Sequence, residues 1–211
     1  MNSTIATSST SLLLLALLVS PLPAAAQSKP TTAQVEALTT QEKEMLGAAQ
    51  DFARRVSETM EGWIAAKEVS EDRLFASMYY PVAKTDPPKF STDWDRLSDR
   101  DVQGIEEAIM TRSQSLVFAV LVDKYGYLPT HNLRYSQPLT GNMANDLVNN
   151  RTKRIFNDKT GLAAAKSVAP FLLQRYQRDT GETMVDLSVP VYVRGMHWGA
   201  VRLGFRASDT R

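Results

Sequence analysis

Three apolar segments joined by two short, glycine-bearing turns make up the last part of the chain. The segments are residues 171–178, 184–193 and 198–205, and the turns are 179–181 and 194–197. Turns this short connect antiparallel neighbours, because parallel strands need a crossover of a dozen or more residues. Two earlier segments, 116–122 and 127–130, flank a turn that ends in Gly126 and predict two more strands. The sequence therefore predicts a five-stranded antiparallel sheet.

A long amphipathic stripe precedes these strands. Apolar residues recur between Val35 and Ile64 in steps of three and four, which predicts one long helix over 35–66. Thr39 and Glu42 have the spacing of a capping box, which marks where the stable part of the helix begins. Further helices are expected from Ser70, over 99–112 and around 145–154, with an irregular loop over 80–94. The predicted class is α+β (α/β in the broad sense), with the long helix packed on the sheet.

The first 26 residues have the pattern of a cleaved signal peptide. An apolar run from Ser11 to Val19 is too short to span a bilayer, which takes ~20 residues. Pro21 and Pro23 follow it, and Ala24-Ala25-Ala26 suits cleavage before Gln27, although no basic residue precedes the run. We expect a periplasmic or secreted single domain over 27–211, with the sheet portion at about 70–206; a retained anchor is the alternative.

Composition excludes several kinds of site and partner. The chain has no cysteine, which rules out disulfides, thiolate zinc sites, iron–sulfur clusters and covalent haem. Its 24 basic residues nearly balance 23 acidic ones, which argues against nucleic acid or an anionic membrane as a partner. We expect no cofactor and no metal, because His131 and His197 are the only histidines.

The densest polar cluster lies in the stretch NRTKRIFNDKTGL, which begins at Asn150. At helical spacing Arg151 and Arg154 share a face, so both guanidinium groups can converge on one carboxylate. The alternative is a solvated basic turn, or ion pairs with Asp146 and Asp158. This cluster is the first candidate for a binding site.

The second candidate is the polar pair at the end of the strand over 127–130. His131 and Asn132 stand either at the mouth of a pocket or in an ordinary loop in which Asn132 starts a turn. Ser136 lies five residues from His131 without a glycine elbow, so catalysis by a nucleophile is not indicated, and a haem bound by a histidine is a minor alternative. The aromatic residues expected to line the pocket are Tyr127, Tyr176 and Trp198.

Four segments carry a resemblance to a known family. They read LFASMYYPVAKTDPPKFST, VLVDKYGYLPTHNLRYSQPLTGN, NRTKRIFNDKTGLAAA and PFLLQRYQRDTGETMVDLSVPVYVRGMHWGAVRLGF. In this order they resemble the extracytoplasmic sensory domain of bacterial methyl-accepting chemotaxis proteins, over about 74–205. The resemblance implies a Cache-type, PAS-like fold that binds a small carboxylate or amino acid between the sheet and its covering loops.

The chain departs from that family in two respects. Chemoreceptors continue into a transmembrane helix and a signalling coiled coil, whereas this chain ends at Arg211, and its loop YYPVAKTDPP lacks the glycine expected after the proline. We expect a free-standing ligand-binding domain, not an enzyme, that either presents its ligand to a membrane receptor or buffers it. The alternative is an interaction module with a vestigial pocket, whose first helix pairs with itself in a homodimer or with another protein, because Leu46 and Ala53 broaden its apolar stripe.

Overall fold

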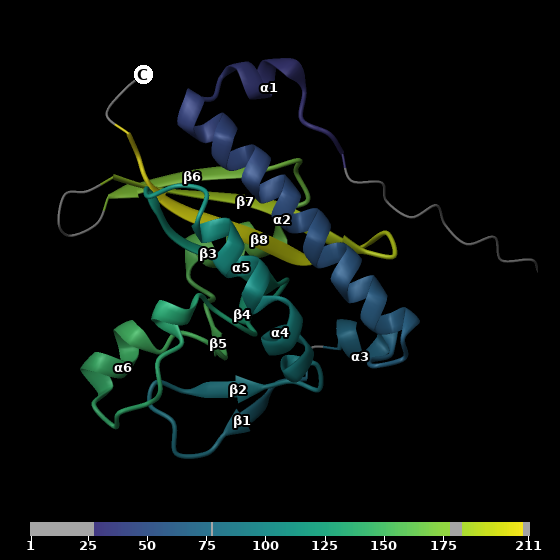
Figure 1. Cartoon of the computed structure of the whole chain (residues 1–211), viewed down its shortest axis with the longest axis vertical. Helices are drawn as coiled ribbons and strands as arrows, with labels where there is room; N and C mark the ends of the chain where they lie inside the picture. Colours follow the sequence, from purple (N-terminus) through teal and green to yellow (C-terminus); the bar gives the residue numbers. More distant parts are fainter. Residues whose placement is uncertain (1–27, 77, 178–182, 209–211) are drawn as a thin grey trace, which may run out of the picture.

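A four-stranded antiparallel sheet lies at the centre of the structure, a computed structural model that describes residues 28–76, 78–177 and 183–208 (Figure 1). The strand order is β3-β8-β7-β6, and β7 pairs with β8 along most of its length. The bounds are β3 Leu116–Asp123, β6 Leu172–Gln177, β7 Thr183–Val193 and β8 Met196–Arg206. The predicted class, helices packed on an antiparallel sheet, is confirmed. The signal peptide predicted over 1–26 lies outside the described residues.

Two helices, not one, lead into the sheet. α1 spans Thr32–Glu36 and α2 spans Thr40–Ala65. The predicted capping box separates them: the Thr39 hydroxyl accepts from the backbone N–H of Glu42, and the Glu42 carboxylate accepts from the N–H of Thr39. The single helix predicted over 35–66 is wrong at this point, because Thr39 adopts extended backbone to make these bonds.

The apolar stripe of α2 is buried against its own chain. α2 crosses one face of the sheet (Figure 1) and packs mainly on β7, with further contacts to β8 and α5. Phe52, Val56 and Met60 are fully buried, and so are Leu46 and Ala53, which broadened the stripe in the sequence. No large apolar side chain of α2 is exposed. The breadth of the stripe is therefore explained without the predicted partner helix.

The chain between α2 and the sheet has more structure than expected. α3 spans Glu71–Phe75 and is capped by Ser70, as predicted. The expected loop over 80–94 contains a small two-stranded sheet of β1, Tyr80–Val82, and β2, Lys89–Ser91. The helix predicted over 99–112 is two helices, α4 Asp95–Asp101 and α5 Gln103–Met110. None of the helices in the described part of the chain is long and apolar enough to cross a membrane.

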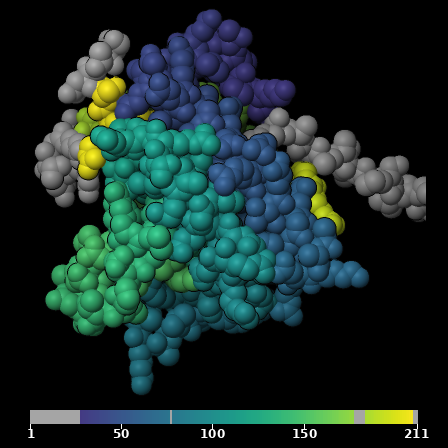
Figure 2. Space-filling view, in the orientation of Figure 1, coloured from purple at the N-terminus to yellow at the C-terminus, as the bar shows by residue number. Residues whose placement is uncertain are grey.

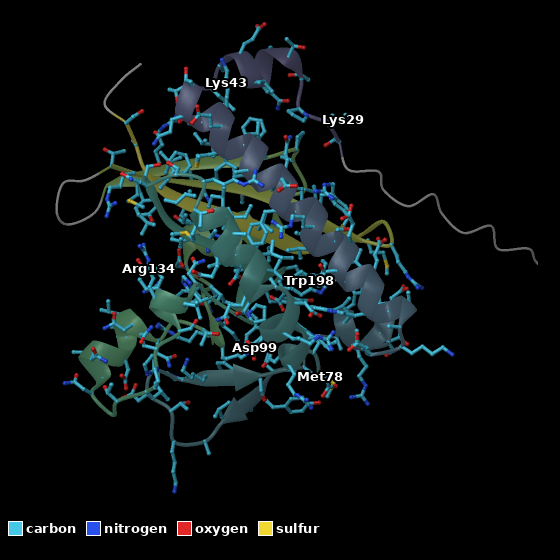
Figure 3. All side chains as sticks on the ribbon, viewed as in Figure 1. Lys29, Lys43, Met78, Asp99, Arg134 and Trp198 are labelled. Atoms are coloured by element: carbon cyan, nitrogen blue, oxygen red, sulfur yellow. The ribbon has the colours of Figure 1, made fainter. Side chains whose placement is uncertain are left out.

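The predicted fifth strand does not join the main sheet. β4, Tyr127–Leu128, pairs instead with β5, Arg154–Ile155, in a separate two-stranded sheet. The outer edge of β3 is occupied by side chains: the N–H groups of Ala119 and Leu121 donate to Asn132 Oδ1 (2.9 Å) and Glu106 Oε1 (3.1 Å). Arg134, labelled in Figure 3, donates to the carbonyl of Val117 on the same edge. Because these side chains satisfy the edge, a fifth strand has no place to pair.

The long segment between β4 and β6 holds two helices and a 3₁₀ turn. The turn spans Leu133–Tyr135, α6 spans Met143–Asn149 and α7 spans Lys159–Lys166. α6 projects from the body of the molecule, in green in Figure 2. The helix predicted to continue to Arg154 ends earlier, because Asn150 turns to extended backbone and Arg151 N–H bonds to the carbonyl of Tyr135 (2.7 Å). α7 was not predicted, although Asp158 caps it and four of its eight residues are alanine or glycine.

Candidate functional site

Buried polar side chains lie on the second face of the sheet, opposite α2. Residues alternate between faces along a strand, so the apolar Val185, Leu187 and Val189 face α2 and the residues between them face the other side. Asp186 and Arg202 meet there, with Arg202 Nη2 2.5 Å from Asp186 Oδ2. Asp186 is fully buried and Arg202 is 9% exposed. This pair is the polar centre of the second face.

α7 covers this face and approaches the ion pair closely. It contacts β7 and β8, and Asp158 caps it by accepting from the N–H groups of Thr160 (3.1 Å) and Gly161 (3.0 Å). A Cβ at Gly161 would lie 2.8 Å from the carbonyl oxygen of Phe156 and 3.3 Å from Arg202 Nη1. Glycine therefore lets the first turn of α7 lie directly against the Phe156 carbonyl and beside Arg202.

A cavity of about 90 Å³ lies beside the ion pair. Apolar side chains from β3, from β4 and from the residue after β5 form one part of its wall, and charged or polar side chains form the rest. The lining residues are Phe118, Val120, Leu128, His131, Arg151, Phe156, Asp158 and Arg202. Cavities that bind small ligands combine apolar walls with a few convergent polar groups, as this one does.

Arg151 is the cation in this cavity that has no ion pair. Its guanidinium is half-buried, and among the described residues it forms neither a salt bridge nor a side-chain hydrogen bond. Of the alternative partners considered from the sequence, Asp146 accepts from Thr140 and Gly141. Asp158 also lines the cavity, but its carboxylate caps α7 and forms no ion pair with Arg151 among the described residues. Burial lowers the pKa of Arg151, because the charged form loses water contacts. An anion in the cavity would supply the missing partner.

Arg154 contacts a phenyl ring that Arg151 also contacts. The Cζ atoms of Arg151 and Arg154 are 4.9 Å and 5.0 Å from the centroid of the Phe156 ring. Both guanidinium groups contact this ring, one from a turn and one from a strand rather than from one helix face, but only Arg151 lines the cavity. Arg154 donates to the carbonyl of Leu147 (3.2 Å), and burial together with the charge of Arg151 lowers its pKa.

His131 faces the cavity as a neutral ring. Its Nδ1 accepts from the N–H of Asn132 (2.7 Å), so the ring hydrogen is on Nε2, which has no partner among the described residues. Burial, together with the charges of nearby arginines of which Arg151 has the largest effect, lowers the pKa of His131 to about 3. The ring therefore offers an uncharged N–H donor at neutral pH.

Three of the predicted site residues have other partners and lie outside this cavity. Tyr127 is buried and donates to the Asp95 carboxylate (2.9 Å), and Trp198, labelled in the interior in Figure 3, donates to the carbonyl of Leu74 (3.0 Å). Asn132 binds the edge of β3 through its Oδ1, as described above. These three hydrogen bonds stabilise the fold.

Tyr176 lies on β6 and is 39% exposed. It does not line the cavity, but it is close enough to Arg151 to affect the pKa of that guanidinium.

The sequence reasoning missed Arg202, Asp186 and the two phenylalanines of the cavity. A signal was present: Val-Asp-Leu-Ser-Val from Val185 and Val-Arg-Leu-Gly-Phe from Val201 alternate strictly, which places Asp186 and Arg202 on one face of adjacent strands. Strand register, which the sequence does not give, then decides that they meet.

Two larger grooves lie elsewhere on the molecule. One of about 690 Å³ runs between 28–30, α2 and Tyr192, and one of about 710 Å³ lies between the start of α2 and Arg175. Their arginines are already paired, Arg54 with Asp51 and Glu58, and Arg175 with Glu42. Neither groove contains a predicted site residue, so the smaller cavity is the better candidate. The described residues contain no cluster of three side chains suited to a metal ion.

Comparisons with known proteins add little to this description. No family model and no curated protein matches the chain. One solved structure, an extracellular ligand binding receptor from Desulfohalobium retbaense DSM5692, is 13% identical with a TM-score of 0.33. The match covers 80% of this chain but 26% of that one. A likeness at this TM-score supports no conclusion about fold or function.

Proposed function

We propose that this chain is an extracytoplasmic ligand-binding domain of the sensory type, which binds a small carboxylate in the cavity beside Arg151. The sequence features of a signal peptide and the resemblance to chemoreceptor sensory domains support export, a Cache-type fold and service to a membrane receptor. The proposal describes a binding protein and assigns no catalytic residue.

The observation that carries the proposal is the half-buried guanidinium of Arg151, which has no anionic partner in the described residues. A guanidinium offers parallel N–H donors that match the two oxygens of a carboxylate. His131 Nε2–H supplies a further donor, and Phe118, Val120 and Leu128 supply an apolar wall. An apolar cavity of about 150 Å³ binds benzene, so a cavity of about 90 Å³ suits a carboxylate with a short carbon chain.

Arg151→Ala is expected to weaken binding of such a ligand by about 10- to 100-fold. Hydrogen bonds to charged groups contribute about 1.5–3 kcal/mol, which corresponds to that range in Kd. A thermal-shift screen of short carboxylates and amino acids would identify the ligand first, because a ligand at a hundredfold excess over Kd stabilises the folded state by about 2.7 kcal/mol. Titration calorimetry on both chains then measures the ratio of affinities.

Arg175→Ala is the matched control, because Arg175 is an arginine outside the cavity and is paired with Glu42. It should leave ligand affinity unchanged. Equal affinities for the Arg151→Ala chain and the original chain would show that the cavity is not the site, and a folded chain that binds none of the panel would contradict the proposed function.

A further inference from the structure

The two edges of the main sheet differ in how they are covered. β3 and β6 are its outer strands. The outer edge of β3 is satisfied by the side chains of Glu106, Asn132 and Arg134. Two residues of β6 have no such cover: among the described residues, no hydrogen bond from another element reaches the backbone groups of Leu173 or Arg175.

The direction of the backbone groups on β6 follows from the pairing of its neighbour. The carbonyl of Thr183 accepts from Ala207 on the β8 side (3.1 Å), so every second residue of β7 from Thr183 onward bonds toward β8. The alternate residues of β7 bond toward β6, where Asp186 stands opposite Gln174. The N–H and C=O groups of Leu173 and Arg175 therefore point away from the sheet.

The β6 edge lacks the proline and the β-bulge that commonly prevent pairing with a further strand. β6 contains no proline and no bulge, and its register with β7 is continuous from Leu172 to Gln177. The one charge on it that opposes pairing is that of Arg175, whose side chain is 53% exposed and is paired with Glu42. An exposed strand edge of this kind is a template for a further strand.

The sequence of β6 disfavours one antiparallel register with a second copy of itself and fits another. A twofold axis at Arg175 would place two arginines directly opposite each other, which is unfavourable. An axis at Gln174 instead sets Gln174 opposite its own copy, Leu172 opposite the partner's Tyr176 and Leu173 opposite the partner's Arg175. In that register Leu173 and Arg175, whose backbone groups point outward, form the hydrogen-bonded pairs.

We propose that two copies of this chain associate through β6, with the twofold axis at Gln174, to form one continuous eight-stranded sheet. The inference is independent of the ligand proposed above. It also differs from a dimer through α2, whose apolar side chains are already buried within one chain.

A single cysteine provides the test, because the chain contains no cysteine of its own. Residues that face each other in a non-hydrogen-bonded antiparallel pair have Cα atoms about 4.5 Å apart, which is within the range that a disulfide spans. Gln174→Cys is therefore expected to form a disulfide-linked dimer under mild oxidation. Lys43→Cys, at an exposed position on α2, is the matched control and should remain uncrosslinked.

Charge substitutions at Gln174 distinguish the loss of this interface from a general loss of folding. Gln174→Lys and Gln174→Glu should each sediment as monomers, whereas an equimolar mixture should recover the dimer with its doubled mass. Circular dichroism confirms that both variants are folded. A monomeric original chain at high concentration would overturn the proposal, as would a dimer that Gln174→Lys leaves intact or that Lys43→Cys crosslinks instead.

Discussion

Asp186→Ala is expected to lower the free energy of unfolding by about 3–5 kcal/mol. The substitution leaves the Arg202 guanidinium, 9% exposed, without the carboxylate that lies 2.5 Å from its Nη2. A buried charge without a partner is costly because the folded state supplies neither water nor an opposite charge in return. Urea denaturation measures the loss, with the dependence on denaturant expected to stay constant.

Two controls make this prediction specific. Asp93→Ala removes a carboxylate from the exposed pair with Arg73 and should leave the midpoint nearly unchanged. The double substitution Asp186→Leu with Arg202→Met removes both charges and should recover much of the lost stability. An Asp186→Ala chain as stable as the original chain would show that Arg202 reaches another anion or solvent. It would contradict the assignment of the Asp186–Arg202 pair as the polar centre of this face.

Glu106→Gln is expected to remove a decline in stability with rising pH. The carboxyl of Glu106 is fully buried, and its Oε1 accepts from the N–H of Leu121 (3.1 Å) while its Oε2 has no partner among the described residues. Burial raises its pKa well above the ordinary value of 4.5, the nearby Glu107 and Asp99 raise it further, and the Leu121 N–H and Lys153 oppose the shift. The folded chain therefore holds a proton that the unfolded chain releases.

The sign of the effect follows from that difference in proton binding. Stability from Glu106 is fully present below about pH 4.5 and is lost as the pH rises toward the folded-state pKa. Glutamine keeps an acceptor for the Leu121 N–H and does not titrate. The difference in free energy of unfolding between the Glu106→Gln chain and the original should therefore widen above pH 4.5 and then level off.

Glu44→Gln is the control, because Glu44 is exposed on α2 and the substitution removes the same charge. Denaturation curves recorded from pH 4 upward should show no comparable divergence for it. Parallel pH profiles for Glu106→Gln and the original chain would mean that Glu106 is ionised in the folded state.

Glu106 also explains why the prediction of a fifth strand in the main sheet was wrong. The apolar residues of 127–130 have the composition of a strand, and β4 does form, but it pairs with β5. Glu106 and Asn132 occupy the edge of β3 that β4 would have needed. Both are polar residues in segments that read as a helix and a loop, so nothing local identifies them as substitutes for a strand.

Only the part of the candidate site whose residues lie close together in the sequence was predicted. Arg151, Arg154 and His131 were singled out because they cluster in the sequence, and the structure brings all three around the cavity or the Phe156 ring. Asp186 and Arg202 join them from two other strands, 16 residues apart. Tyr127 and Trp198 turned out to have buried partners of their own.

Interactions between residues close in the sequence determined the features that could be predicted from the sequence alone. The Thr39 capping box, the helix after Ser70 and the alternation along β7 and β8 depend on residues within a few positions of one another, so their signals are complete in a short window. The tertiary structure alone decided which strand edge is sealed, which charges meet behind the sheet and that Arg151 has no anionic partner in the described part of the chain. These outcomes depend on distant segments competing for the same buried hydrogen bonds, and that competition is settled only when the whole chain packs.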